Sequence, residues 1–160
     1  MLKPTDKLEL ELGGRYNLRT FDEADIAQYD NAFIEAALSW EATDQLELTA
    51  SVTRSLKEPS ASSALVRDST EYAAGIIWTP NGKWTVDLSG SHERKEEIGG
   101  DEIEFENGVE AGVSYDVTNY LTMFGKISHD WSRETDTSTG ETAKSANTGF
   151  KVGMTTSFEG

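Results

Sequence analysis

A strict alternation of apolar and polar residues, with a period of two, recurs eight times along this chain of 160 residues. It is clearest between Ile103 and Val117, where one set of alternate positions is apolar and the other is polar and largely acidic. Successive side chains of a β-strand point to opposite faces of its sheet. The pattern therefore predicts strands whose two faces meet different surroundings, and no stretch has the periodicity of a helix.

Eight strands are expected, at residues 7–20, 29–42, 45–57, 69–79, 83–95, 103–117, 120–133 and 145–158. Their connections alternate in length. Turn-forming residues make the short ones, at 43–45, 80–82 and 118–119, while the longer polar segments cover 21–28, 58–68, 96–102 and 134–144. Short turns at one rim and long loops at the other are typical of an up-and-down membrane barrel, here with both termini at the short-turn rim.

Hairpins also repeat along the chain. Leu8, Leu46, Trp84 and Leu121 each begin a strand just after a tight turn, at spacings of 38, 38 and 37 residues. Each period contains two strands and one long loop, so we interpret the repeat as a meander rather than a solenoid or propeller. By the same analogy, the segment 4–6 is a turn whose preceding strand is missing.

The dipeptide Asn107-Gly108 conflicts with this assignment, because it is a strong signal for a hairpin turn. The apolar positions keep the same parity before and after it, and the segment 103–106 is short for a strand of its own. We therefore predict one unbroken strand with a β-bulge at this pair.

Composition narrows the classes of function. With 14 basic and 29 acidic residues the net charge is -15, which argues against nucleic acid as a partner and favours cations in any ionic traffic. The absence of cysteine excludes disulfides and thiolate metal sites. Residues 1–6 carry no secretory signal, which a bacterial surface protein needs, so we expect a mature chain or a piece of a longer one.

Alternation alone leaves open whether the apolar face meets lipid or lines a protein core, as in a soluble β-barrel with an apolar ligand cavity. Aromatic residues at both strand ends favour lipid, because amphipathic rings prefer the two bilayer interfaces. Ten residues separate Phe105 from Tyr115, which gives an apolar band about 25 Å tall. The expected interface aromatics are Trp40, Trp78, Trp84, Tyr115 and Phe158 near the short turns, and Tyr72, Phe105 and Trp131 nearer the long loops.

The polar positions mix carboxylates, bases and hydroxyls with glycines such as Gly75, Gly112, Gly149 and Gly153, which suits a narrow polar interior. The only charges expected on the apolar side are Arg54 and Arg94. The charges could select cations by their field, or they could form a salt-bridge network that fills a closed barrel. The expected lumen-lining residues are Glu9, Glu11, Arg15, Glu35, Glu47, Asp87, Glu110, Lys126 and Lys151.

Several segments carry a family resemblance: 31–41, 43–48, 52–55, 67–75 and the closing 151–158. They resemble bacterial outer-membrane β-barrels, and more narrowly the family called putative β-barrel porin 2. The resemblance implies the C-terminal part of a larger barrel in the bacterial outer membrane. The final aromatic strand, ending at Phe158, resembles the signal that the outer-membrane assembly machinery reads, although Glu159 and Gly160 follow it.

The sequence gives little support for a catalytic site or a metal-binding site. His92 and His129 lie on the apolar parity, whereas Ser128 and Asp130, the candidate partners of His129, point to the other face of a regular strand. The acids at 22–25 and 101–102 do not have the spacing of an EF-hand loop. We therefore expect no catalytic residue, no metal and no cofactor.

The sequence thus predicts an all-β protein, an antiparallel up-and-down transmembrane β-barrel of eight strands forming one domain over residues 1–160. The expected partner is a lipid bilayer or detergent. The first functional hypothesis is a porin-like barrel that passes small solutes, preferably cations. The alternatives are a closed structural or binding barrel with long surface loops, and the soluble barrel.

Overall fold

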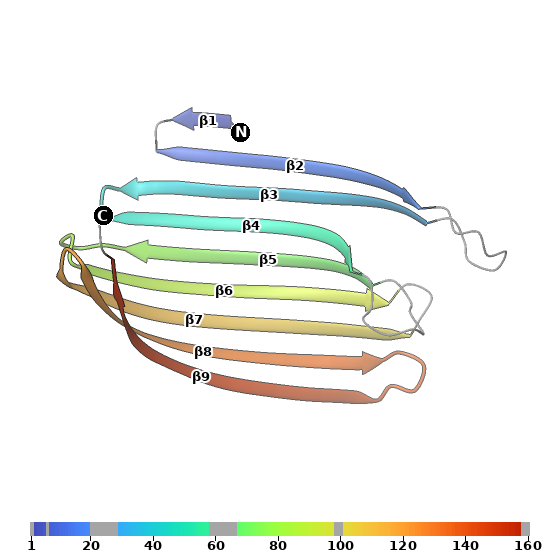
Figure 1. The fold of residues 1–160 in the computed structure, drawn as a ribbon. Helices are drawn as coiled ribbons and strands as arrows, with labels where there is room; N and C mark the ends of the chain where they lie inside the picture. The colour runs from blue at the N-terminus through green and yellow to red at the C-terminus, as the bar shows by residue number, and fades with distance from the viewer. Residues whose placement is uncertain (1, 6, 20–28, 58–66, 98–100, 158–160) are drawn as a thin grey trace.

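Nine antiparallel strands follow one another in a single sheet, each paired with the next in chain order (Figure 1). The computed structural model describes residues 2–5, 7–19, 29–57, 67–97 and 101–157. Strands β1 and β9 are the two edges of the sheet. The strands are β1 (Leu2–Thr5), β2 (Leu8–Arg19), β3 (Tyr29–Thr43), β4 (Leu46–Lys57), β5 (Arg67–Trp78), β6 (Trp84–Glu97), β7 (Glu102–Thr118), β8 (Leu121–Asp136) and β9 (Thr142–Thr156).

Strands β2 to β9 are the eight expected strands, and each end lies within three residues of its predicted position. The all-β, up-and-down assignment is therefore confirmed. The hairpin repeat is confirmed as well, because β2, β4, β6 and β8 begin at Leu8, Leu46, Trp84 and Leu121. One detail was wrong: residues 4 and 5, expected in a turn with no strand before it, belong to the short strand β1 that precedes β2.

Asn107 and Gly108 lie inside an unbroken β7, as predicted, but the expected bulge is absent. Both residues pair in regular register, Asn107 with Trp131 and Gly108 with Asp130. Glycine at position 108 lets two neighbouring side chains approach the backbone closely. A Cβ there would lie 2.9 Å from Asp130 Oδ1 and 3.0 Å from Ser91 Oγ. No extra residue interrupts the ladder here, so the strand needs no bulge.

The predicted long loop at 134–144 is instead a short turn, Thr137 to Glu141. Both strands are longer than predicted, because Glu134 pairs with Ala143 and Thr135 pairs with Thr142. Threonine is β-branched and therefore favours a strand. Asp136 closes the turn, because its Oδ1 accepts hydrogen bonds from the amides of Ser138 at 2.8 Å and Thr139 at 2.9 Å. In the other three long segments, residues 21–28, 58–66 and 98–100 lie outside the described residues, while residues 67–68, 96–97 and 102 belong to strands.

The Asp136 turn gives a pH-dependent prediction. Hydrogen bonds from the Ser138 hydroxyl and from the amides of Ser138 and Thr139 hold the pKa of Asp136 below its usual 3.8. A depressed pKa means that the turn is stabilised above pH 3.8 and loses that stabilisation as the pH falls through the lower folded value. We expect the amide chemical shifts of Ser138 and Thr139 to titrate below pH 3.8 in an NMR series. D136N should abolish this titration, and a midpoint above 3.8 would refute the assignment.

Strand register separates two faces. Directly opposed residues continue from strand to strand, so each face consists of transverse rows, and we name the faces the apolar face and the polar face. Among the described residues no apolar side chain is buried, and many on the apolar face are open to the surroundings, Leu88 at 51% and Val113 at 41% among them. One apolar row is Leu8, Trp40, Leu48, Ile76, Leu88, Ala111, Ile127 and Phe150.

The expectation that Arg54 and Arg94 are the only charges of the apolar face was wrong. Register also places Asp68, Glu96, Arg133 and Lys144 on this face, close to the loop rim. Asp68, Glu96 and Lys144 were assigned to loops but join the ladder, because β5, β6 and β9 extend further toward that rim than predicted. Arg133 lies inside the predicted strand 120–133, where its apolar parity was overlooked.

Glycines show which way the sheet curves. On the polar face a Cβ would come within 3.0 Å of a neighbouring side chain at Gly75, Gly108, Gly112, Gly149 and Gly153. On the apolar face Gly14, Gly90 and Gly125 have room for one, with the nearest atoms at 3.7 Å or more. Curling a sheet crowds the side chains of its concave face. The polar face is therefore the concave one.

This crowding can be tested by adding one methyl group on each face. We expect G112A to lower the free energy of unfolding by about 1 kcal/mol, because the Asp87 carboxylate would have to rotate away from the new Cβ and from Lys126. G125A, on the apolar face, should change it by less than about 0.5 kcal/mol. Urea unfolding of the full chain in detergent micelles measures both, and equal effects would contradict the assigned curvature.

Candidate functional site

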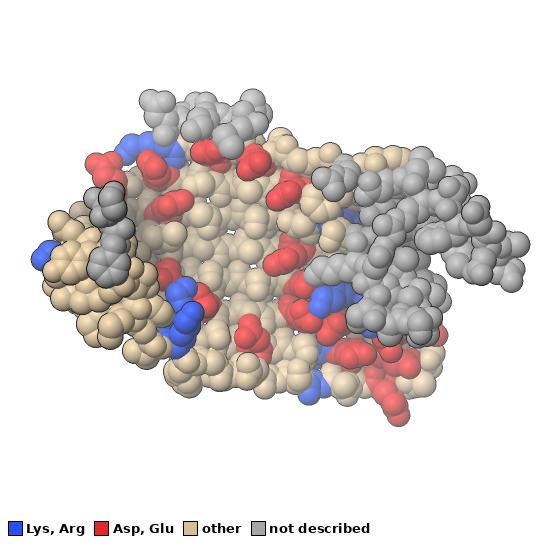
Figure 2. Space-filling view, in the orientation of Figure 1, with Lys and Arg blue, Asp and Glu red and all other residues tan. Residues whose placement is uncertain are grey.

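The polar face is the candidate site, and it carries most of the described acidic side chains (Figure 2). The predicted lumen residues all share this face by register. For Arg15 only the backbone, paired with Phe33, lies within the description. The others are Glu9, Glu11, Glu35, Glu47, Asp87, Glu110, Lys126 and Lys151.

Four glutamates lie in one transverse row of the polar face. The row runs Gly13, Glu35, Thr53, Glu71, Glu93, Glu106, Ser132 and Ser145, and we call it the acidic row. Glu71, Glu93 and Glu106 are directly opposed on three neighbouring strands. Like charges in such pairs are destabilising, so the fold concentrates negative potential here at a cost in stability.

Three members of the acidic row, Glu71, Glu93 and Glu106, were missed as site residues. Their assignment to the polar face was visible in the sequence. Glu71 lies an even number of residues from Gly75, and Glu106 from Glu110, so each pair shares a face. What the sequence did not supply was the register between strands, which aligns them.

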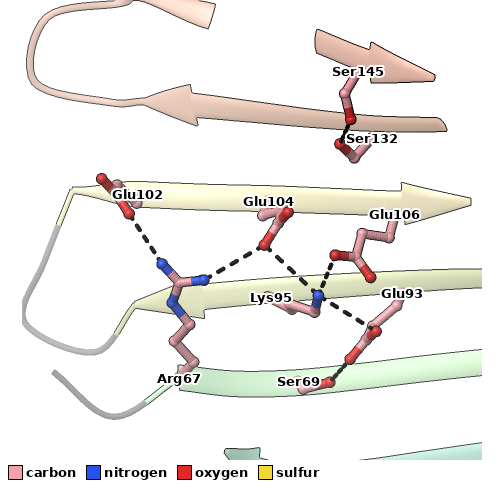
Figure 3. A network of polar contacts seen from close by, with 9 residues as sticks. All are labelled: Arg67, Ser69, Glu93, Lys95, Glu102, Glu104, Glu106, Ser132 and Ser145. Atoms are coloured by element: carbon pink, nitrogen blue, oxygen red, sulfur yellow. Dashed lines mark hydrogen bonds and ion pairs between the residues drawn. The ribbon is translucent and has the colours of Figure 1, made fainter. Parts of the chain in front are cut away.

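A network of ion pairs joins the acidic row to the loop rim (Figure 3). Lys95 Nζ contacts carboxylates of Glu93 and Glu104, each at 3.7 Å, and also Glu106. Arg67 pairs with Glu102 at 3.2 Å and with Glu104 at 3.5 Å. Four carboxylates thus share two basic side chains, and the network remains net negative.

A second cluster lies toward the short turns and brings together three predicted residues. Lys126 Nζ lies 2.8 Å from Glu110 Oε1 and 3.9 Å from Asp87 Oδ2. Lys151 is directly opposite Lys126, and its ammonium lies 5.6 Å from the centre of the Phe124 ring. The remaining predicted residues Glu9, Glu11, Glu35 and Glu47 are not part of this cluster.

The polar face has two hollows, each with carboxylates among its lining residues. One, of about 320 Å³, includes Glu71, Glu93, Glu106 and Asp130. The other, of about 400 Å³, lies between Glu9 and Glu11 on β2 and the small residues of β3 to β6. The first hollow suits a hydrated cation, since its polar groups are carboxylates, hydroxyls and amides, whereas the second is lined largely by alanines and other small residues.

The histidines lie on the apolar face. His92 Nδ1 is 2.8 Å from Asn107 Oδ1, and His129 Nδ1 is 2.7 Å from Thr148 Oγ1. His129 also stacks on Trp131, with ring centroids 5.5 Å apart. Since Ser128 and Asp130 belong to polar-face rows, the three side chains do not converge on a catalytic arrangement.

Within the described ranges, no group of three or more His, Cys, Asp or Glu side chains could hold a metal ion. The acids at 22–25 lie outside these ranges. The part of the chain that the structure describes also has no helix long and apolar enough to cross a membrane.

Most predicted interface aromatics lie near the ends of the apolar face. Near the short turns, Trp84 packs on Tyr115 with centroids 4.6 Å apart, and Trp40 and Trp78 are 45% and 47% exposed. Toward the loops, Tyr72 and Trp131 share one row and Phe105 lies in the next. Phe158 lies outside the described residues.

The chain matches a known protein family over nearly its whole length. The profile of the family described as putative beta-barrel porin 2 matches residues 1–158. Among curated proteins and solved structures, none matches the chain.

Proposed function

Because the chain belongs to the putative beta-barrel porin 2 family, we propose that it forms the wall of a bacterial outer-membrane pore for small solutes, with a preference for cations. In this proposal the apolar face contacts lipid and the polar face lines water. The outer-membrane assembly machinery inserts the barrel, and the wall performs no catalysis.

The observation that carries the proposal is the opposite character of the two faces. The apolar face is open and lacks any buried apolar side chain among the described residues, whereas the crowded concave face carries the carboxylates. A soluble barrel with an apolar ligand cavity needs the reverse arrangement. Lipid on the convex side satisfies the apolar rows without a protein core.

Strand edges determine whether the lumen is open. In hydrocarbon every backbone N–H and C=O needs a partner, so the edges at β1 and β9, and the part of β2 beyond its short pairing with β1, must pair with a strand. Pairing β2 with β9 would close eight long strands, whose interior side chains just fill the barrel. Additional strands would widen it into a water-filled channel, which is the arrangement that we propose.

Cation preference follows from the acidic row, which contains four glutamates and no basic residue. A charge about 7 Å from a permeating ion in water contributes about 0.6 kcal/mol, or a factor of about 2.7 in local ion concentration. Several aligned carboxylates therefore favour cations over anions severalfold.

Planar-bilayer recording tests the proposal directly. With the full chain folded into lipid and a KCl gradient across the bilayer, we expect stable conductance and a reversal potential toward that of K⁺. A reversal potential toward that of Cl⁻ would refute the cation preference. Folded, inserted protein without conductance would refute the open pore and favour the second candidate.

The second candidate is a closed barrel that serves as a structural or loop-binding protein. The ion pairs of Lys126 and Lys95 favour it, because charges that fill a closed interior need partners. The two candidates share the same faces and differ only in strand count.

A further inference from the structure

Four basic residues of the apolar face lie in one transverse row at its loop side. In the described strands the row runs Ile34, Arg54, Thr70, Arg94, Phe105, Arg133 and Lys144, and we call it the basic row. The neighbouring row toward the short turns contains Tyr72, His92 and Trp131. The basic row therefore marks the border between the apolar band and the loop rim.

Two of the four bases are neutralised by the chain itself. Arg54 Nη2 lies 2.6 Å from Asp68 Oδ2, and Arg94 Nη2 lies 2.6 Å from Glu96 Oε2. Both carboxylates belong to the next row toward the rim. The other two bases of the row, Arg133 and Lys144, have no carboxylate paired with them in this way.

Arg133 and Lys144 are directly opposed on β8 and β9, and both side chains are exposed. Among the described residues no ion pair involves either of them. Directly opposed like charges destabilise an antiparallel pair. An anion between them would remove this repulsion, and adjacent strands about 4.8 Å apart bring both within reach of one phosphate.

We propose that Arg133 and Lys144 bind the phosphate of an anionic lipid headgroup in the leaflet on the loop side. This inference rests on the proposed function, which places lipid against the apolar face. Arginine matches phosphate oxygens with two parallel N–H donors, and lysine adds a compact charge. The acyl chains would lie over the exposed apolar surface beyond the pair, where Trp131, Ile127 and Phe150 are 40%, 44% and 77% exposed.

The exposed apolar surface next to Arg133 and Lys144, on the side of the short turns, favours a lipid over free phosphate as the ligand. A soluble anion would gain only the two basic contacts, whereas a lipid also covers apolar side chains that point away from the polar face. Basic residues close to a membrane surface each favour anionic lipid by about fivefold, so the pair should contribute about 25-fold.

Native mass spectrometry of the full chain, folded in neutral detergent micelles, can measure this binding. Phosphatidic acid and phosphatidylcholine are the lipid probes, and inorganic phosphate is the competitor. We expect preferential binding of phosphatidic acid, a loss of about 25-fold in affinity in R133Q/K144Q, and little displacement by millimolar phosphate.

K126Q/K151Q is the matched control, because these lysines are also directly opposed on β8 and β9 but lie on the polar face. It should retain the binding of phosphatidic acid. Equal loss in both double variants, or equal affinity for the two lipids, would overturn the proposal. Displacement by inorganic phosphate at the same concentrations would overturn the assignment to a headgroup.

Failure of this inference can be told apart from failure of the proposed function. Insertion into phosphatidylcholine vesicles, measured by co-sedimentation after a carbonate wash, tests only the membrane barrel. Protein that inserts but shows no lipid preference overturns the headgroup site alone. Protein that does not insert overturns both.

Discussion

Replacement of Leu88 by arginine should lower the stability of the chain in a bilayer by about 2–4 kcal/mol. Leu88 lies on β6, midway between Trp84 at the short-turn side and Arg94 in the basic row, and its side chain is 51% exposed on the apolar face. If lipid covers this face, the guanidinium must lie in the middle of the hydrocarbon. A loss of about 2–4 kcal/mol is typical for arginine at that depth on the lipid face of a barrel strand. Urea titration of folding into vesicles measures the change.

Ser89 supplies the control, because it is the next residue on the same strand and points to the polar face. S89R should cost less than about 1 kcal/mol, since its charge enters a polar surface beside Glu110. Equal costs for the two variants would contradict lipid on one face and water on the other. A larger cost for S89R would reverse the assignment of the faces.

The second large effect concerns the acidic row. We expect E71Q/E93Q/E106Q to lower the K⁺ over Cl⁻ permeability ratio by about sevenfold or more, because one charge at about 7 Å raises local K⁺ and lowers local Cl⁻ by about 2.7-fold each. Salt screens this effect, so the loss should shrink as the KCl concentration rises. The measurement is the reversal potential in planar bilayers at low and high KCl.

A variant with the same loss of charge away from the row controls for net charge. D44N/D101N/E141Q removes three exposed carboxylates at the turns and rims. Its permeability ratio should stay within about twofold of the unmodified chain. If it falls as far as that of the row variant, the selectivity reflects net charge and not the alignment of Glu71, Glu93 and Glu106.

The face of each strand could be predicted from sequence, because parity alone assigns a side chain to a face. The positions of Leu48, Val86 and Val113 on one face and of Glu47, Asp87 and Glu110 on the other follow directly from the alternation. Turns were equally readable where Asn81-Gly82 and Asp44-Gln45 connect the hairpins. Gly82 has a φ of 68°, a backbone conformation that suits glycine.

Register could not be predicted, and it is register that builds both rows. Irregularities in the ladder between Glu41 and Thr43 and between Asp116 and Thr118 shift the pairing beside short turns. A shift of this kind changes which residues of β3 lie opposite those of β4, so the alignment of Glu35 with Thr53 and Glu71 had no local signal. The same holds for Arg133 and Lys144, whose pairing depends on how far β8 and β9 extend toward the rim.

Spin-label accessibility along β6 tests the central claim most directly, and the absence of native cysteine makes single-cysteine labels clean. Each position from Val86 to Ser91 is labelled in turn, and its collisions with oxygen, which concentrates in lipid, and with a water-soluble nickel chelate are measured in vesicles. We expect Val86, Leu88 and Gly90 to meet oxygen, whereas Asp87, Ser89 and Ser91 do not. The contrary result is that labels at the even positions meet neither reagent while labels at the odd positions meet the chelate. It would show a dry apolar core and contradict the account.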